Sequence, residues 1–208
     1  EVQKLNNYNR PTATKEYRVA LSIAGSDSSG GAGIQADIKT FSALGVYGAT
    51  AITAITVQNT LGVHAQLALP PQMVYDQIVA VAEDIHPAAV KIGMLANAEI
   101  ASSVADALEH YSIPIILDPV MVSTSGHRLL SSEAEGVVKQ RLLPMATLIT
   151  PNIPEMEALA NMPITTYEDK VRAAEHLFGY GVRAILLKGG HEVGDTKSDI
   201  LFTPSAKG

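Results

Sequence analysis

The amino-acid sequence predicts an α/β fold in which helices cover both faces of a mainly parallel sheet. Short apolar runs alternate with amphipathic segments along nearly the whole chain, which is the pattern of βαβ units. Charged residues make up only 17% of the 208 residues, below the ~25% that is usual for globular domains. A low charged fraction in a chain of this length indicates a thick interior, as in a sheet with helices on both sides.

The candidate strands are short apolar runs, several of them rich in Ile and Val and each too short for a helix. In chain order they are Val19–Ala24, Thr50–Val57, Ala89–Ile92, Ile115–Leu117, Leu148–Thr150 and Ala184–Leu187. A further strand is expected at Asp199–Phe202. The segment Leu61–Leu69 breaks the alternation, and we expect it to form a short strand that extends from the sheet as a lid.

The segments between these runs have the periodicity of amphipathic helices. In the first of them, apolar residues at positions 34, 38, 41 and 44 recur at helical spacing. The expected helices are Gln35–Leu44, Met73–Asp84, Ile100–Tyr111, Glu133–Leu142, Pro154–Ala160 and Glu168–Phe178. The last of these follows Thr165 and Thr166, either of which can cap its N-terminus.

Composition excludes several classes of protein. The net charge is −6 and no Lys/Arg cluster occurs, so nucleic-acid binding is not expected. The chain has no cysteine, which excludes disulfides and thiolate metal sites. No apolar run approaches the ~18 residues of a membrane span. We therefore expect a cytoplasmic protein, with a disordered or vector-derived tail at residues 1–17 and a single domain at residues 18–208.

The loop Gly25–Gly33 lies between the first strand and the first helix and consists almost entirely of small residues. Such a loop lets backbone amides approach a bound group, either a phosphate or something flat and neutral. A P-loop is excluded because Gly31-Ala32 follows Gly30 where Lys-Ser/Thr is required. The dinucleotide fingerprint fails as well, since no glycine lies two positions after Gly25 and the second strand leads into Gln58 rather than an acidic residue.

Polar residues follow the expected strands at their carboxyl ends, where open α/β sheets bind ligands. With the small or apolar residues beside them, the strand ends deliver Ser26, Asp27, Gln58, Asn59, Gly93, Met94, Asp118, Asn152, Glu155, Lys188, Gly189, Gly190 and His191. We expect them to surround one crevice. Together the lysine, the aspartate and the Asn/Glu pair resemble the charge-neutralising set of a phosphoryl-transfer enzyme.

Each of these residues also has a structural interpretation. Asp118 precedes a proline and could be a turn residue. Asn152 and Glu155 could form a capping box at a helix start, or could be oxygen ligands for a magnesium ion that bridges phosphates. Lys188 ends an apolar run and needs an anion nearby. Lys91 has the same setting, so one of the two lysines could simply extend its charged end to water.

Seven motifs resemble, in order, those of the hydroxymethylpyrimidine/phosphomethylpyrimidine kinases, which are ribokinase-like enzymes of thiamin biosynthesis. The motifs are AGSDSSGGAGIQAD at 24–37, KTFSALG at 39–45, VQNT at 57–60, KIGM at 91–94, LDPVM at 117–121, TPNIPE at 150–155 and KGGH at 188–191. The resemblance extends from about Arg18 to the end of the sequence. It implies a ribokinase-like three-layer α/β/α sandwich.

The same resemblance implies an activity and a substrate site. ATP would phosphorylate 4-amino-5-hydroxymethyl-2-methylpyrimidine and then its monophosphate, giving the pyrophosphate. The aminopyrimidine would lie against the small-residue loop, with Gly25 and Ala32 as its contacts. Asp37 and Gln58 would hydrogen-bond the ring nitrogens and the amino or hydroxymethyl groups, since an amide offers a donor beside an acceptor. Met94 would pack against the ring.

The resemblance also assigns the phosphate side. Asp118 and Glu155 would position Mg²⁺, and Asn152 and Lys188 would face the ATP phosphates. A homodimer through the lid segment Leu61–Leu69 is expected on the same ground.

The family pattern continues with a Gly-Thr-Gly-Cys turn that supplies the anion hole and the catalytic base, and the 208 residues do not contain it. We therefore expect the C-terminal part of the domain to be absent, sheet and helix faces to be uncovered, and this polypeptide to bind pyrimidine better than it phosphorylates it. No residue is assigned as the base. The alternatives are a pyridoxal or pyridoxine kinase and a non-catalytic pyrimidine-binding module.

Overall fold

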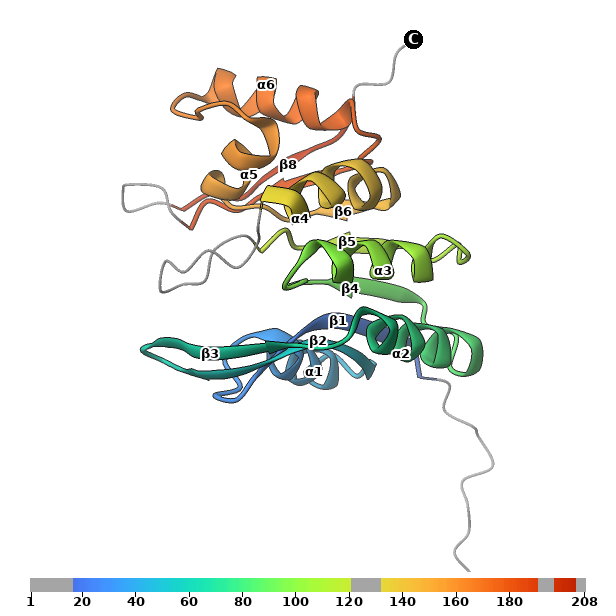
Figure 1. The fold of residues 1–208 in the computed structure, drawn as a ribbon. Coiled ribbons are helices and arrows are strands. Elements are labelled where there is room, and N and C mark those ends of the chain that lie inside the picture. The colour runs from blue at the N-terminus through green and yellow to red at the C-terminus, as the bar shows by residue number, and fades with distance from the viewer. Residues whose placement is uncertain (1–16, 121–131, 191–196, 205–208) are drawn as a thin grey trace, which may run out of the picture.

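The computed structural model describes residues 17–120, 132–190 and 197–204, and these residues build one eight-stranded sheet (Figure 1). The strands are β1 Val19–Asp27, β2 Tyr47–Asn59, β3 Gly62–Ala68, β4 Ala89–Ile92, β5 Ile115–Leu117, β6 Leu148–Ile149, β7 Ile185–Leu187 and β8 Ile200–Phe202. Their order is β3-β2-β1-β4-β5-β6-β7-β8. Pairing is parallel from β2 to β7, and the two edge strands, β3 and β8, run antiparallel. The predicted mainly parallel sheet is confirmed.

Helices connect these strands at the predicted places. They are α1 Gly33–Ala43, α2 Pro71–Asp84, α3 Ala98–Leu108, α4 Ser132–Val137, α5 Ile153–Ala160 and α6 Tyr167–Phe178. The expected helix at Glu133–Leu142 instead changes from α to π geometry, with the π segment at Val138–Leu142. Thr166 caps α6, as predicted. None of the described helices has the length and hydropathy to cross a membrane.

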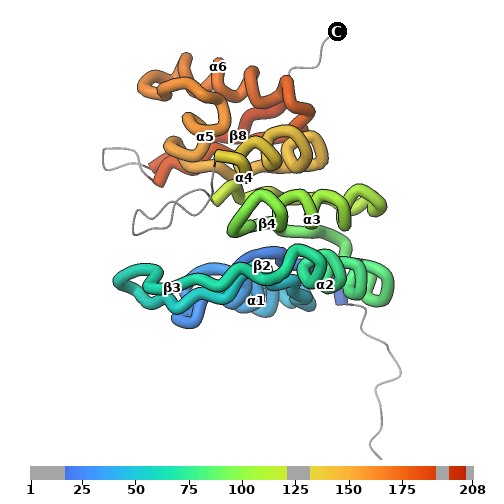
Figure 2. Tube along the Cα trace, viewed as in Figure 1, coloured from blue at the N-terminus to red at the C-terminus, as the bar shows by residue number. Residues whose placement is uncertain are grey.

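From β4 to β8 the chain proceeds strand by strand towards one edge of the sheet, as the change from green to red in Figure 2 shows. The first strand lies inside the sheet, β2 and β3 are added on one side of it, and β4 to β8 follow in order on the other. The carboxyl ends of β1, β2, β4 and β5 are therefore neighbours, although they come from segments of the chain that are far apart.

One face of the sheet forms the core. Leu21, Val90 and Ile115 lie in register on three adjacent strands, and each side chain is at most 3% exposed. Helices α2 to α6 cover this face, because their buried residues belong to the same apolar cluster as the strand residues. The transfer of these side chains from water is the main source of stability for a sheet of this kind.

Helix α1 packs on the opposite face, over β1 and β2. An added Cβ at Gly48 of β2 would meet Phe41 and Ile38 of α1, so this glycine lets the helix approach the strand. The arrangement confirms the predicted α/β fold with helices on both faces of the sheet.

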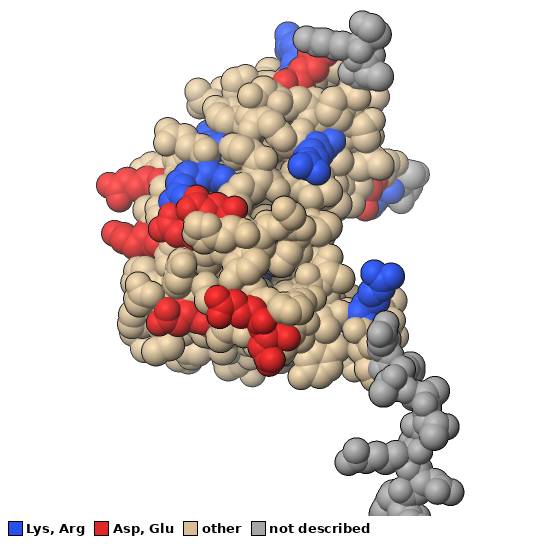
Figure 3. All heavy atoms as spheres, turned by 90° about the vertical axis from the view of Figure 1, so that its right-hand side faces the viewer, with Lys and Arg blue, Asp and Glu red and all other residues tan. Residues whose placement is uncertain are grey.

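Beyond α1, this second face carries a line of apolar side chains across β5 to β8. Ile116, Leu148 and Leu186 are half-buried, and Leu201 is 61% exposed. They share the face because Ile116 pairs with Leu148 and Leu186 pairs with Leu201. The outline of the molecule is hollowed on this side in Figure 3. The described part of the chain thus leaves this strip of the sheet accessible.

The start of α1 depends on a backbone contact that only glycine allows. Gly33 has φ +57°, and an added Cβ would lie 2.2 Å from the carbonyl oxygen of Gly25. We predict that Gly33→Ala lowers the free energy of unfolding by more than about 3 kcal/mol, since backbone strain and a backbone clash add. Urea unfolding followed by circular dichroism measures the change.

Gly45→Ala is the matched control. Gly45 also has a positive φ, +72°, but nothing lies within 4 Å of the added Cβ. It should cost about 1 kcal/mol, the strain of the left-handed conformation alone. Equal losses for the two variants would contradict the predicted clash at Gly33.

Candidate functional site

A cavity of about 270 Å³ opens at the carboxyl ends of the central strands. Its lining comes from β1, β2, β4, α1, the loop between β1 and α1, β3 and the segments that follow β4 and β5. The residues are Ala24, Gly25, Ser26, Asp27, Ala32, Gly33, Ala36, Asp37, Thr56, Gln58, Val63, Lys91, Gly93, Met94, Asp118 and Val120. Five predicted substrate-site residues, at positions 25, 32, 37, 58 and 94, are all among them.

Asp27 holds the small-residue loop in place. Its carboxylate accepts hydrogen bonds from the backbone N–H groups of Ser29, Gly31 and Ala32 and from the Ser29 hydroxyl, at 2.8–3.0 Å. Burial raises the pKa of Asp27, but these hydrogen bonds outweigh it and leave the pKa below its usual value. The backbone amides of residues 29, 31 and 32 are therefore occupied by a carboxylate of the protein itself.

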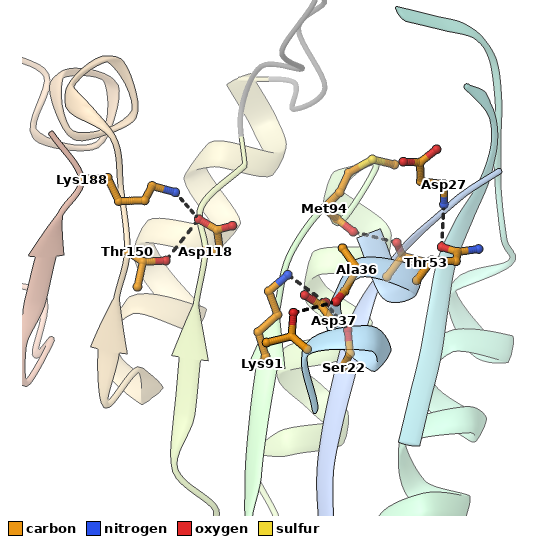
Figure 4. A network of polar contacts seen from close by, with 12 residues as sticks. Ser22, Asp27, Ala36, Asp37, Thr53, Lys91, Met94, Asp118, Thr150 and Lys188 are labelled. Carbon is orange, nitrogen blue, oxygen red and sulfur yellow. Dashed lines mark hydrogen bonds and ion pairs between the residues drawn. The ribbon is translucent and has the colours of Figure 1, made fainter. Parts of the chain in front are cut away.

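Met94 forms one wall of the cavity against the loop. An added Cβ at Gly25 would lie 3.1 Å from the Met94 methyl carbon, so the absence of a side chain at Gly25 leaves room for Met94. The Met94 carbonyl accepts a hydrogen bond from Thr53 Oγ1 at 2.7 Å (Figure 4), which fixes the segment after β4 to β2. The wall is thus apolar and anchored.

Gln58 lies at the end of β2 and faces the cavity. Its main chain is tied to the loop, because Ser28 Oγ donates to the Gln58 carbonyl and accepts from the Gln58 N–H at 2.8 and 3.0 Å. Its Oε1 lies 3.2 Å from Thr56 Oγ1. Within the described chain Nε2 has no partner. The amide therefore has donors available to a ligand.

Asp37 points from α1 towards the strands, where two donors meet it (Figure 4). Ser22 Oγ donates to Oδ2 at 2.6 Å and Lys91 Nζ donates to the same oxygen at 3.0 Å. From the sequence, either Lys91 or Lys188 could simply have extended its charged end to water; in the structure Lys91 is bound to a carboxylate within the cavity.

A second charged cluster lies at the ends of β5, β6 and β7. Lys188 Nζ donates to Asp118 Oδ1 at 2.8 Å and lies 3.9 Å from Glu155 Oε2. Thr150 Oγ1 donates to Asp118 Oδ1 at 3.1 Å (Figure 4). The anion that Lys188 required is therefore Asp118, and two carboxylates lie on one ammonium group.

Asn152 and Glu155 form the capping box at the start of α5, which was the structural interpretation of this pair. Asn152 Oδ1 accepts from the Glu155 N–H at 2.9 Å, and Glu155 Oε2 accepts from the Asn152 N–H at 2.8 Å. The carboxylate of Glu155 is buried. Neither residue lines the cavity described above.

The expectation of one crevice that unites all the strand ends needs correction. The cavity collects the ends of β1, β2, β4 and β5, whereas Asn152, Glu155 and Lys188 lie outside its lining. Asp118 connects the two groups, because it lines the cavity and binds Lys188. His191 and Met121 lie outside the described residues.

The donor set of the second cluster suits a magnesium ion only together with ligands from elsewhere. Among the described residues no three His, Cys, Asp or Glu side chains gather as a metal site. Asp118 and Glu155 provide two carboxylates, and Mg²⁺ is commonly held by one or two carboxylates plus substrate phosphates. These two residues fit that type of site.

Sequence reasoning did not assign roles to Ser22, Thr53, Thr56 or Val63. Ser22 is fully buried in β1 and reaches Asp37 across the sheet face. Val63 enters the cavity from β3, the strand expected as a lid. Alternation along β1 could have placed Ser22 on the α1 face, but its partner is 15 residues away and cannot be read from spacing.

Known proteins share both this sequence and this fold. A sequence model of the family described as phosphomethylpyrimidine kinase matches residues 27–207. The hydroxymethylpyrimidine/phosphomethylpyrimidine kinase of Bacillus subtilis is 49% identical over 188 residues, which cover 89% of this chain and 69% of that protein.

Solved structures agree. The crystal structure of a phosphomethylpyrimidine kinase from Clostridium difficile superposes with a TM-score of 0.84 at 48% identity and covers 90% of this chain and 81% of that one. A pyridoxal kinase from Bacillus subtilis, in complex with ADP, superposes with a TM-score of 0.82 at 34% identity over 90% of this chain and 72% of that one. The chain belongs to the phosphomethylpyrimidine kinase family.

Proposed function

We propose that this protein transfers the γ-phosphoryl group of ATP to the hydroxymethyl oxygen of 4-amino-5-hydroxymethyl-2-methylpyrimidine, and then to the monophosphate to give the pyrophosphate. The observation that carries the proposal is the cavity, which combines an apolar wall at Met94 with polar atoms of Gln58 and Asp37 that have no partner among the described residues. The family of the chain and the kinase names of its relatives agree with it.

The ring would lie between the small-residue loop and Met94. Gly25 and Ala32 leave space for a planar group, and Met94 offers a polarizable sulfur and methyl to its face. Gln58 would donate from Nε2 to a ring nitrogen, and Asp37 would accept from an amino or hydroxymethyl group through Oδ1. The substrate would thus be read by one donor and one acceptor.

The phosphates would lie on the Asp118 side. Asp118 and Glu155 would hold Mg²⁺, and Asn152 and Lys188 would face the phosphates of ATP. When bound, Mg²⁺ neutralises charge on the β- and γ-phosphate oxygens. Lys188 is already within 2.8 Å of Asp118, so this ammonium would bring a second positive charge close to the transferred group.

A pyridoxal kinase is the second candidate, because solved pyridoxal kinases superpose with TM-scores near those of the phosphomethylpyrimidine kinase. Both substrates carry a hydroxymethyl group on a six-membered heterocycle. Competition between them distinguishes the two candidates.

We predict that the protein, in its natural full length, forms ADP from Mg-ATP with the hydroxymethylpyrimidine, and that kcat/KM with pyridoxal is at least about tenfold lower. A coupled assay for ADP measures both rates.

Asp118→Asn should lower kcat about 100-fold or more, since it removes a charge beside Lys188. The same coupled assay measures this change.

Asp76→Asn is the control for this substitution, because Asp76 lies on the exposed side of α2, where Gln72 is its one hydrogen-bond partner among the described residues. It should leave turnover unchanged. Faster turnover of pyridoxal would favour the second candidate, and no ADP with either substrate would exclude both.

Gln58→Ala tests the proposed ring contact. We expect the dissociation constant of the hydroxymethylpyrimidine to rise about tenfold, because a donor to the ring is lost and not replaced. Isothermal titration calorimetry measures it. Gln66→Ala is the matched control, since Gln66 lies on the neighbouring strand of the same hairpin and is exposed. An unchanged constant for Gln58→Ala would remove this residue from the site.

A homodimer through the β2–β3 hairpin is part of the proposal. Opposite to the cavity, this hairpin carries Ile55, Val57 and Leu67, which are 42%, 58% and 67% exposed. They share one face, because Ile55 pairs with Leu67 and Val57 lies two residues further along β2. An exposed apolar edge of this kind is a place for association.

Leu67→Glu should therefore convert the dimer to a monomer, as measured by light scattering of the purified protein. Leu201→Glu is the control, because Leu201 is similarly exposed, at 61%, but lies at the other edge of the sheet. A wild-type monomer, or a dimer lost only with Leu201→Glu, would contradict this interface.

A further inference from the structure

The two donors on Asp37 come from separate strands and meet one of its oxygens. Ser22 reaches Oδ2 from β1 at 2.6 Å, and Lys91 reaches Oδ2 from β4 at 3.0 Å. Ser22 is fully buried, and the side chains of Lys91 and Asp37 are 24% and 18% exposed. The carboxylate is therefore held in one orientation by groups that the rigid centre of the sheet positions.

This arrangement leaves the two oxygens of Asp37 unequal. Oδ2 accepts one hydrogen bond from the buried Ser22 hydroxyl and one from the Lys91 ammonium group. Oδ1 has no partner within the described chain. Asp37 lines the cavity, so a ligand meets a carboxylate with one free acceptor. An unoccupied carboxylate could accept two parallel N–H bonds from a protonated aminopyrimidine edge. With Oδ2 already occupied, that second contact is blocked.

The charge of Lys91 acts in the same direction. Its ammonium lies in the wall of the cavity, where an added Cβ on Gly93 would be 2.8 Å away. A protonated ring that reached Asp37 would lie beside this cation, and like charges disfavour ionisation of each other. A neutral ring meets no such penalty and still gives its amino or hydroxyl proton to Oδ1.

We propose that Ser22 and Lys91 are positioning residues which fix Asp37 as a single acceptor, so that the site selects the neutral form of its aminopyrimidine. The inference rests on the proposed function. It adds the protonation state of the substrate that the site selects and the two residues that determine it.

The other charged groups around the cavity do not replace Lys91. Asp27 is held by the amides of its own loop, and Asp118 is paired with Lys188. Lys39, on the same helix as Asp37, bonds the Gly30 carbonyl. The ionisable side chains that line the cavity are Asp27, Asp37, Lys91 and Asp118, and no described histidine is among them. Substitution of Lys91 can therefore separate its contribution to the pH dependence of substrate binding from the contributions of the other ionisable groups in the cavity.

The test is the dissociation constant of the hydroxymethylpyrimidine, measured by calorimetry across the pH range in which the free ring takes up a proton. As the pH is lowered, the affinity of the wild-type protein should fall in proportion to the neutral fraction of the ring.

Lys91→Met should bind the hydroxymethylpyrimidine about tenfold more weakly than wild type at a pH where the ring is neutral. As the pH is lowered and the ring is protonated, the affinity of this variant should stay level or rise. Lys91→Arg keeps the cation and should keep the wild-type trend. Ser22→Ala should weaken binding about threefold at every pH and also keep the trend.

Lys139→Met is the matched control. Lys139 makes an ion pair of similar length with Glu135, is comparably buried, and lies outside the cavity. It should match wild type at every pH. If Lys91→Met follows the wild-type trend, the inference is wrong. If wild type binds no hydroxymethylpyrimidine at any pH, the proposed function fails first and the inference with it.

A second measurement needs no variant and covers the case in which Lys91→Met does not fold. The ultraviolet spectrum of the ring changes when it is protonated, so the spectrum of the ring bound to wild type can be compared with free neutral and free protonated ring. At a pH where the free ring is mostly protonated, the bound ring should have the neutral spectrum. A protonated spectrum would overturn the inference while leaving the proposed function intact.

Discussion

The carboxylate of Asp27 organises the loop on which the rest of the site depends. A run of small residues such as Gly25–Gly33 has high conformational freedom and would not adopt one shape without a fixed partner. The Asp27 carboxylate is this fixed partner, because it accepts hydrogen bonds from the backbone N–H groups of residues 29, 31 and 32. The loop therefore cradles an anion that belongs to the protein. This explains in physical terms why its spacing matches no phosphate-binding motif, and it leaves the outer side of the loop to a neutral ligand.

The position of α1 follows from this loop. Gly33 begins the helix in close contact with the Gly25 carbonyl. Gln35 then bonds back to the strand, with Nε2 on Ser26 Oγ at 2.7 Å and Oε1 accepting from the Asp27 N–H at 2.8 Å. With the first turn fixed at both ends, the next turn carries Asp37 over Ser22 and Lys91. The acceptor in the cavity is thus set by contacts that begin at Asp27, ten residues earlier in the chain.

Local pattern predicted the elements well, because an apolar run of three to eight residues between turn signals is typical of an inner strand. It also offered the capping box of Asn152 and Glu155 as one of two interpretations, since a helix cap is a contact over three residues. The partners of the lysines could not be predicted in this way. Lys91 and Asp37 are 54 positions apart, and Lys188 and Asp118 are 70 apart. Only the strand order, with β4 inserted beside β1, brings the first pair together.

The role of Asp27, in contrast, had a local signal in the sequence. An aspartate followed by Ser-Ser-Gly-Gly is typical of turns that are capped by a side chain.

Lys91 and Lys188 are both partly buried ammonium groups paired with carboxylates, but the net charges of the two clusters differ. Each ends a buried strand and is stabilised by a carboxylate, as the cost of burying a charge requires. Inside the cavity, Lys91 and Asp37 form one pair with a formal charge of zero, which suits a neutral ring. At the rim, Lys188 meets both Asp118 and Glu155, at 2.8 and 3.9 Å, so that cluster keeps a formal charge of −1. A surplus negative charge at the rim, beside a Lys91–Asp37 pair of zero net charge, would attract a cation to the rim and not to the ring site. The division of the site into a ring side and a metal side can therefore arise from how many carboxylates surround each lysine.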